Sequence, residues 1–112
     1  MAFTATLEVK NEVAFVTITG ELDASVAPQF RTQIEAAAAQ HVKRLVLRMD
    51  DLSYMASAGL RSLVFAKQKM GSGVDIFMVA VQEPVAETIK MTGFDNSVIM
   101  VPSYDEANPP SA

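Results

Sequence analysis

The sequence predicts an α/β fold in which helices pack on a single, mostly parallel β-sheet. Three observations lead to this prediction. Short apolar, β-branched runs alternate along the chain with stretches in which apolar residues recur at helical spacing. Residues 74–81 are apolar on both faces, as in a strand that is buried inside a sheet. The first two strand-like runs are joined by a short polar turn, so the first strand is expected to form an antiparallel edge.

An N-terminal hairpin is predicted for residues 3–19. Apolar and polar residues alternate over residues 3–9, which is the pattern of a half-exposed strand. Residues 10–12 are polar and predict a tight turn, and the β-branched residues 13–19 predict the second strand. Gly20 ends this strand.

The first helix is expected after a loop at residues 21–23. Ser25 is a favourable N-cap residue, and Pro28 is tolerated in a first helical turn. The stretch is rich in alanine and extends to about Gln40. Four apolar residues recur at helical spacing and should face the core: Val26, Phe30, Ile34 and Ala37.

A second strand–helix unit follows. Residues 45–47 predict a short strand, and residues 50–55 predict a loop. A helix is expected from Ser57 to the glycines that begin at Gly71, which favour a helix C-terminus. The residues expected on its buried face are Leu60, Leu63 and Val64.

The last part of the chain predicts the buried strand, a third helix and a final strand. The buried strand is residues 74–81, Pro84 opens the third helix, Gly93 closes it, and residues 98–101 predict the final strand. Residues 103–112 begin with the Ser-x-x-Glu form of a capping box, which predicts a short C-terminal helix and tail. The expected order is β-β-α-β-α-β-α-β plus that short helix.

Length and composition limit the functions that are open to the chain. Its 112 residues fit one domain, residues 1–112, with a formal net charge of −4, one His and no Cys. This composition excludes a disulfide framework, a thiolate nucleophile and a cysteine-based zinc site, and the acidic balance argues against nucleic-acid binding. No signal peptide or membrane-spanning run is visible. We therefore expect a cytoplasmic protein with no cofactor, no metal and no direct membrane binding.

The most informative segment is residues 52–60, where a strand is followed by a short loop and a helix that opens near Ser57. The small residues Ala56, Ala58 and Gly59 leave the serine hydroxyl sterically open. The N–H groups of a first helical turn and the helix dipole favour an anion at this position. Ser57 is therefore either an ordinary helix N-cap or a residue that receives a phosphate.

At this point the sequence resembles the STAS domain family, and within it the anti-sigma factor antagonists. The resemblance covers nearly the whole chain, and the matching segments occur in the family's order. They are Gly20-Glu21-Leu22-Asp23, Asp51-Leu52-Ser53-Tyr54-Met55, Ser57-Ala58-Gly59-Leu60 and Met91-Thr92-Gly93-Phe94.

The resemblance implies a switch at Ser57. In the family, the matching serine is phosphorylated by an anti-sigma factor that is also a serine kinase. The unphosphorylated form binds this partner and frees a sigma factor, phosphorylation stops the binding, and a phosphoserine phosphatase restores it. This chain departs from the family at Ala56, where Asp is common, and at Ala58, where Ser is common. We expect a monomer or a weak dimer.

Three further residues are candidates for the partner surface. Asp23 follows the second predicted strand, and it is either a contact residue or an ordinary Asx-turn acid. The 100° helical step places Phe65 opposite the expected buried face, on the side of Arg61, where an exposed aromatic suggests a partner contact. The full set expected to bind the partner is Asp23, Ala56, Ser57, Ala58, Gly59, Arg61 and Phe65.

A second function stays open at this stage. The same fold can serve as an accessory STAS subunit that docks on the ATPase of a membrane transporter and needs no phosphorylation. The retained Ser57 and the lack of an extra amphipathic segment favour the antagonist. An enzyme has little support, because no metal site, catalytic triad or P-loop is visible.

Overall fold

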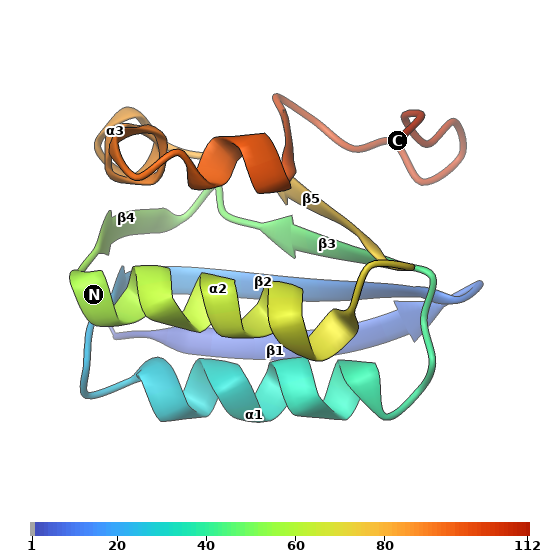
Figure 1. Ribbon diagram of the computed structural model, residues 1–112, viewed down its shortest axis with the longest axis horizontal. Helices are drawn as coiled ribbons and strands as arrows, with labels where there is room; N and C mark the ends of the chain where they lie inside the picture. Colours follow the sequence, from blue (N-terminus) through green and yellow to red (C-terminus); the bar gives the residue numbers. More distant parts are fainter. Residues whose placement is uncertain (1) are drawn as a thin grey trace.

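The computed structural model describes residues 2–112 (Figure 1). The predicted α/β order is confirmed, with one additional strand and no C-terminal helix. Along the chain the elements are β1 (Thr4–Lys10), β2 (Val13–Leu22), α1 (Ala27–Ala38), β3 (Arg44–Arg48), β4 (Leu52–Met55), α2 (Ser57–Met70), β5 (Asp75–Val79), α3 (Glu83–Met91), the 3₁₀ helix η1 (Phe94–Ser97) and β6 (Ile99–Val101).

The strands form one sheet in the order β1-β2-β3-β5-β6, and β4 pairs with the last residues of β2. The β1–β2 pair is antiparallel and the other pairs are parallel, as predicted. The hairpin turns at Asn11 and Glu12, whose positive φ angles of 50° and 65° match the twist of the two strands. β5 lies between β3 and β6, which confirms that this strand is internal.

One face of the sheet is covered by helices. Val16, Leu47 and Met78 lie in one row across β2, β3 and β5, and all three are fully buried. α1 and α2 run side by side over this face (Figure 1), and α3 adds to the same core. Burying each of these large apolar side chains stabilises the fold by about 1.5 to 3 kcal/mol. The largest helical side chains in this core are Phe30, Ile34, Leu63 and Ile89.

The other face carries a second row, Phe15, Val46 and Phe77, and the apolar residues that pack against it in residues 2–112 include none from a helix. Tyr104 closes it by packing edge-on against Phe15 and Phe77, with ring centroids 5.7 Å and 5.6 Å apart. Arg44 lies over Phe77 at 4.4 Å and donates a hydrogen bond of 3.1 Å to the Tyr104 hydroxyl. The C-terminal segment thus covers part of this face of the sheet, in the place of a helix.

Three predictions for the chain's secondary structure were wrong. The second strand does not end at Gly20, because β2 continues to Leu22, where its last residues pair with β4. Residues expected to form a loop instead form β4, because the backbone of Leu52–Met55 pairs with the end of β2. Residues 103–112 are not helical. The Glu106 carboxylate does not cap a helix, because it accepts hydrogen bonds from Arg48 at 2.7 Å and Lys10 at 3.1 Å.

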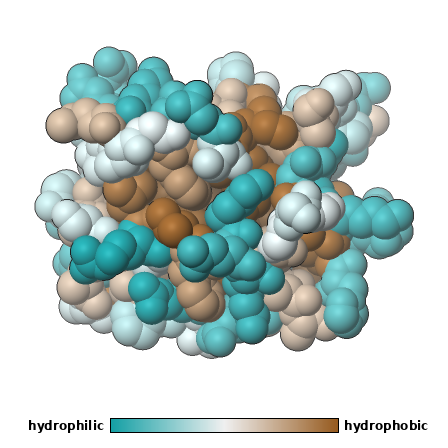
Figure 2. All heavy atoms as spheres, viewed as in Figure 1, coloured by the Kyte–Doolittle hydropathy of each residue, from teal (hydrophilic) through white to brown (hydrophobic). Residues whose placement is uncertain are grey.

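The surface of the view in Figure 1 is mostly polar, with apolar side chains emerging in patches between polar ones (Figure 2). No helix in residues 2–112 is long and apolar enough to cross a membrane. Over the same residues, no group of three or more His, Cys, Asp or Glu side chains is placed to hold a metal ion.

Candidate functional site

The candidate site lies where β2 and β4 end and α1 and α2 begin, at the left of Figure 1. Leu22 and Met55 are paired in register at the carboxyl ends of these parallel strands. The Ala56 N–H donates a hydrogen bond of 2.9 Å to the Leu22 carbonyl, which ties the start of α2 to the end of β2. This pairing brings the loop that contains Asp23 beside Ser57, although 34 positions of numbering separate them.

Ser57 is the first residue of α2, and its side chain is exposed. The N-cap position is Ala56, and no side chain caps the helix, so the interpretation of Ser57 as an N-cap is wrong. The first turn of α2 also contains no acidic residue. The Ser57 hydroxyl is therefore not occupied as a cap, and no carboxylate of the first turn itself faces the positive end of the helix dipole.

Gly59 fixes how the first turn of α2 sits on the sheet. A Cβ atom at this position would lie 2.7 Å from the Leu22 carbonyl oxygen and 2.9 Å from the Cγ atoms of Leu22 and Met55. Only glycine allows this approach without a shift of the backbone. Because Gly59 faces the strand ends, Ser57 and Arg61, each two residues away, lie about 200° around the helix and face outward.

Asp23 forms an Asx turn, which was one of the two alternatives for it. Its Oδ1 atom accepts hydrogen bonds from the Ser25 N–H at 2.9 Å and from the Ser25 hydroxyl at 2.6 Å. The hydroxyl bond holds the pKa of Asp23 below its usual value, so the carboxylate stays ionised. The prediction that Ser25 is the N-cap of α1 was wrong. The N-cap position is Val26, and no side chain caps the helix.

The prediction that Phe65 is exposed was wrong. Phe65 is half-buried and packs against the helix-covered core, whereas Val64, expected in the core, is 38% exposed. The buried face of α2 is rotated from the prediction because most of its residues are small, and Ser62 satisfies its hydroxyl internally by donating 3.0 Å to the Ala58 carbonyl. The buried residues of α2 are Gly59, Ser62, Leu63 and Ala66.

Arg31 of α1 lies beside Phe65, one of the predicted partner-binding residues, and the sequence analysis did not identify it. Its guanidinium lies over the Phe65 ring at 5.2 Å, and its buried Nε atom has no hydrogen-bond partner. Over residues 2–112, neither Arg31 nor Arg61 forms an ion pair with a carboxylate. The available signal was a lone cation beside the core residue Phe30 in an alanine-rich helix.

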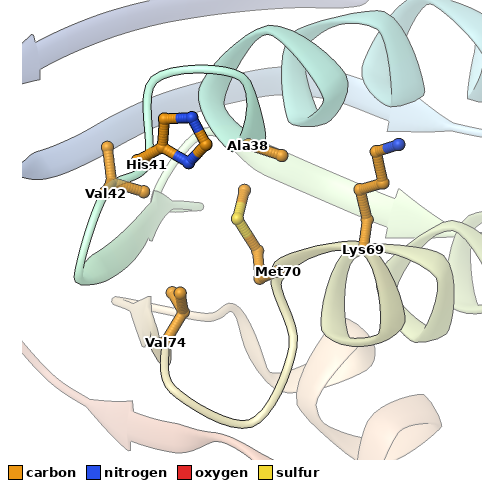
Figure 3. Close-up of a pocket in the computed structure, with 6 residues that line it drawn as sticks. All are labelled: Ala38, His41, Val42, Lys69, Met70 and Val74. Atoms are coloured by element: carbon orange, nitrogen blue, oxygen red, sulfur yellow. The ribbon is translucent and has the colours of Figure 1, made fainter.

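A cavity lies at the opposite end of the helices and is not part of this site. It has a volume of about 320 Å³, and Figure 3 shows Met70 projecting into it between the ends of α1 and α2. Met70 is 13 residues after Ser57, which is about 20 Å along a helix axis. The cavity is lined by Ala38, His41, Val42, Lys69, Met70 and Val74.

Comparison with known proteins identifies the family to which this arrangement belongs. A model of the STAS domain matches residues 4–107, nearly the whole chain. The chain belongs to the STAS domain family. The fold is thus that of a STAS domain.

Relatives of this STAS domain include anti-sigma factor antagonists. The anti-sigma-F factor antagonist RsfB of Mycobacterium tuberculosis is 26% identical over 106 residues, which are 95% of this chain and 87% of RsfB. The crystal structure of an anti-sigma factor antagonist from Mycobacterium paratuberculosis superposes with a TM-score of 0.85 at 27% identity, covering 95% of this chain and 91% of that one. The Bacillus cell fate determinant SpoIIAA in its phosphorylated form shares the fold, with a TM-score of 0.67 at 20% identity over 89% of this chain and 91% of that one.

Proposed function

We propose that this STAS domain is an anti-sigma factor antagonist that is switched by phosphorylation of Ser57. The observation that carries the proposal is the exposed, uncapped Ser57 at the start of α2, beside the end of β2. Its similarity to RsfB supports the class of partner. The partner is an anti-sigma factor of the serine-kinase type, and a phosphoserine phosphatase reverses the modification.

In this proposal the unphosphorylated form presents a small neutral surface to the partner. Ala56 and Ala58 are half-buried and Gly59 is buried, so little bulk surrounds the Ser57 hydroxyl. Asp23 adds one ionised carboxylate from the neighbouring loop. Arg31, whose guanidinium lies over the Phe65 ring, is a further member of the proposed contact surface. The other members are Asp23, Ala56, Ser57, Ala58, Gly59, Arg61 and Phe65.

Phosphorylation changes the charge of this surface and leaves the fold in place. A phosphate adds about −1.5 to −2 charges, which takes the formal charge from −4 to about −6. No internal hydrogen bond of the Ser57 side chain stabilises α2, so the modification breaks no cap. An interface that accommodated a neutral hydroxyl must then desolvate a dianion, which costs several kcal/mol.

The test is phosphorylation of the purified chain by its kinase-type anti-sigma factor in the presence of ATP, read by mass spectrometry. The proposal predicts the mass gain of one phosphate, mapped to Ser57 and absent in Ser57→Ala. Ser72→Ala, at the far end of α2, is the matched control and should be modified normally. Modification at another residue, or none with an anti-sigma factor that binds the chain, contradicts the proposal and favours a STAS subunit that works without phosphorylation.

A further inference from the structure

The first two turns of α2 determine which side chain can bind a phosphate on Ser57. Ser57 and Arg61 are four residues apart, and both are exposed. Side chains at this spacing are neighbours on a helix surface, with Cβ atoms about 5 to 6 Å apart. We infer that Arg61 binds the phosphate of phosphorylated Ser57. This inference rests on the proposed function, and it names the residue that positions the phosphate.

The docking of α2 on the strand ends sets this geometry. Gly59 is in contact with Leu22 and Met55, so this side of the helix cannot rotate outward. Ser57 and Arg61 lie on the opposite side, about 40° apart around the axis and about 6 Å apart along it. The guanidinium of Arg61 therefore reaches the Ser57 hydroxyl position without any change in the backbone.

Other cations on the two neighbouring helices lie too far from Ser57. Lys67 and Lys69 are in the last turn of α2, about 15 Å or more along the axis. The Arg31 guanidinium is over Phe65, eight residues after Ser57 and about 12 Å along the axis. Among the cations of α1 and α2, Arg61 alone is within one turn of Ser57.

The charges around Ser57 leave Arg61 free for this role. Arg61 forms no ion pair with a carboxylate in residues 2–112, and the first turn of α2 has no acid that competes for it. The acids on the adjoining strand end are Glu21 and Asp23, and Asp23 already accepts two hydrogen bonds from Ser25. A planar guanidinium binds phosphate oxygens in pairs, which suits it to this contact.

Binding by Arg61 gives the phosphorylated form two properties. The phosphate is held over the outer face of α2, across the surface proposed for the partner. It is also fully ionised at neutral pH, because a nearby cation lowers the pKa of its second ionisation. Because Ala56 precedes the serine, no carboxylate at the preceding position opposes that ionisation, and the carboxylate of Asp23 accepts hydrogen bonds from Ser25.

The experiment uses the full chain with phosphoserine inserted at position 57 during translation, so it needs no kinase. The second pKa of the phosphate is measured by ³¹P NMR. We expect Arg61→Gln to raise this pKa by about half a unit or more, and Arg61→Lys to restore part of the difference. Lys69→Gln removes the same charge from the far end of α2 and should leave the pKa unchanged. Added 1 M salt should shrink the Arg61 effect.

Equal pKa values in the parent chain and in Arg61→Gln would overturn the inference, as would an equal effect of Lys69→Gln. Arg61 is exposed, so a thermal melt of unmodified Arg61→Gln should match the parent and show that folding is intact. The outcome is separate from the kinase test. If Ser57 is not the natural phosphorylation site, the titration still reports whether Arg61 binds its phosphate. If the kinase acts but Arg61 has no effect, the switch stands and this inference fails.

Discussion

Two arginine–aromatic clusters in this STAS domain differ in how their arginines are partnered. On the helix-free face, Arg44 donates hydrogen bonds to the Tyr104 hydroxyl and the Pro110 carbonyl, and Arg48 donates to Glu106. On the helical side, Arg31 lies over Phe65 with a buried Nε atom that has no partner. Each arginine of the first cluster has a hydrogen-bond partner within the chain, and the buried Nε atom of the second has none, so we call them the saturated and the unsaturated cluster.

The difference separates a structural surface from a candidate binding surface. Arg44 and Arg48 lie over the row of Phe15, Val46 and Phe77 and are held there by hydrogen-bond partners from the C-terminal segment of the same chain. The unsaturated pair of Arg31 and Phe65 lies on α1 and α2, the helices that begin at the candidate site. Buried donors without partners are uncommon in native proteins, so the surroundings of Arg31 need an explanation that those of Arg44 and Arg48 do not.

The largest effect on stability is expected on the saturated side. Tyr104→Ala removes two edge-on aromatic contacts and a partner of Arg44, and should lower the free energy of unfolding by about 2 to 3 kcal/mol. Tyr104→Phe keeps the ring and loses the hydrogen bond, so it should cost about 1 kcal/mol. Urea denaturation measures both. A Tyr104→Ala variant as stable as the parent would show that the C-terminal segment does not close this face.

The next effect concerns the contact that positions the candidate site. Gly59→Ala places a Cβ atom 2.7 Å from the Leu22 carbonyl oxygen, and should destabilise the fold by about 2 kcal/mol. The matched control is Gly73→Ala, where a Cβ meets no atom within 4 Å and φ is not positive, so stability should hardly change. If the two variants melt alike, α2 is not fixed by Gly59 in the way described.

A smaller effect on stability is expected at the unsaturated cluster. Phe65→Ala removes a half-buried ring and the surface under Arg31, and should cost about 1 kcal/mol in the free energy of unfolding. The same variant should weaken binding of the anti-sigma factor about tenfold or more if this cluster contacts it. Phe65→Leu keeps the apolar contact with the core and serves as the stability control. Unchanged binding by a folded Phe65→Ala would remove this cluster from the interface.

The weakest effect is a dependence of stability on acid. The hydrogen bond from Arg48, followed by that from Lys10, lowers the pKa of Glu106. A lowered carboxyl pKa contributes stability that is complete above the ordinary pKa and is lost as pH falls below it through the lowered value. Glu106→Gln should therefore flatten the fall in stability over this range, relative to Glu87→Gln on α3. Parallel curves for the two variants would contradict this assignment.

The sequence predicted the elements whose signals are local. β5 is apolar on both faces because it is buried on both, and the hairpin turn is polar because its two residues are at the surface. β4 was missed because it has four residues, of which Ser53 and Tyr54 are exposed, and its pairing depends on the end of β2. Its formation is a tertiary effect with no periodic pattern of its own.

The errors near the site and the C-terminus have the same kind of cause. Glu106 matched a capping box, but its partners Arg48 and Lys10 are 58 and 96 residues away along the chain. Phe65 was misplaced because the buried face of α2 includes Gly59, Ser62 and Ala66. These residues are small or polar, so a search for large apolar residues at helical spacing does not place them in the core. The position of Ser57 at a helix start was predictable, since strand, loop and helix signals adjoin there. The absence of a capping hydrogen bond from the Ser57 side chain could not be predicted from the sequence.

The central claim is that the charge state of Ser57 controls partner binding. The direct measurement is a calorimetric titration of the kinase-type anti-sigma factor with three forms of the chain: unmodified, carrying phosphoserine at position 57, and Ser57→Ala. The account predicts similar affinities for the unmodified chain and Ser57→Ala, since Ser57 caps no helix. It predicts at least about a hundredfold weaker binding of the phosphorylated chain, equivalent to a loss of about 3 kcal/mol. Equal affinity for the unmodified and phosphorylated forms would contradict it.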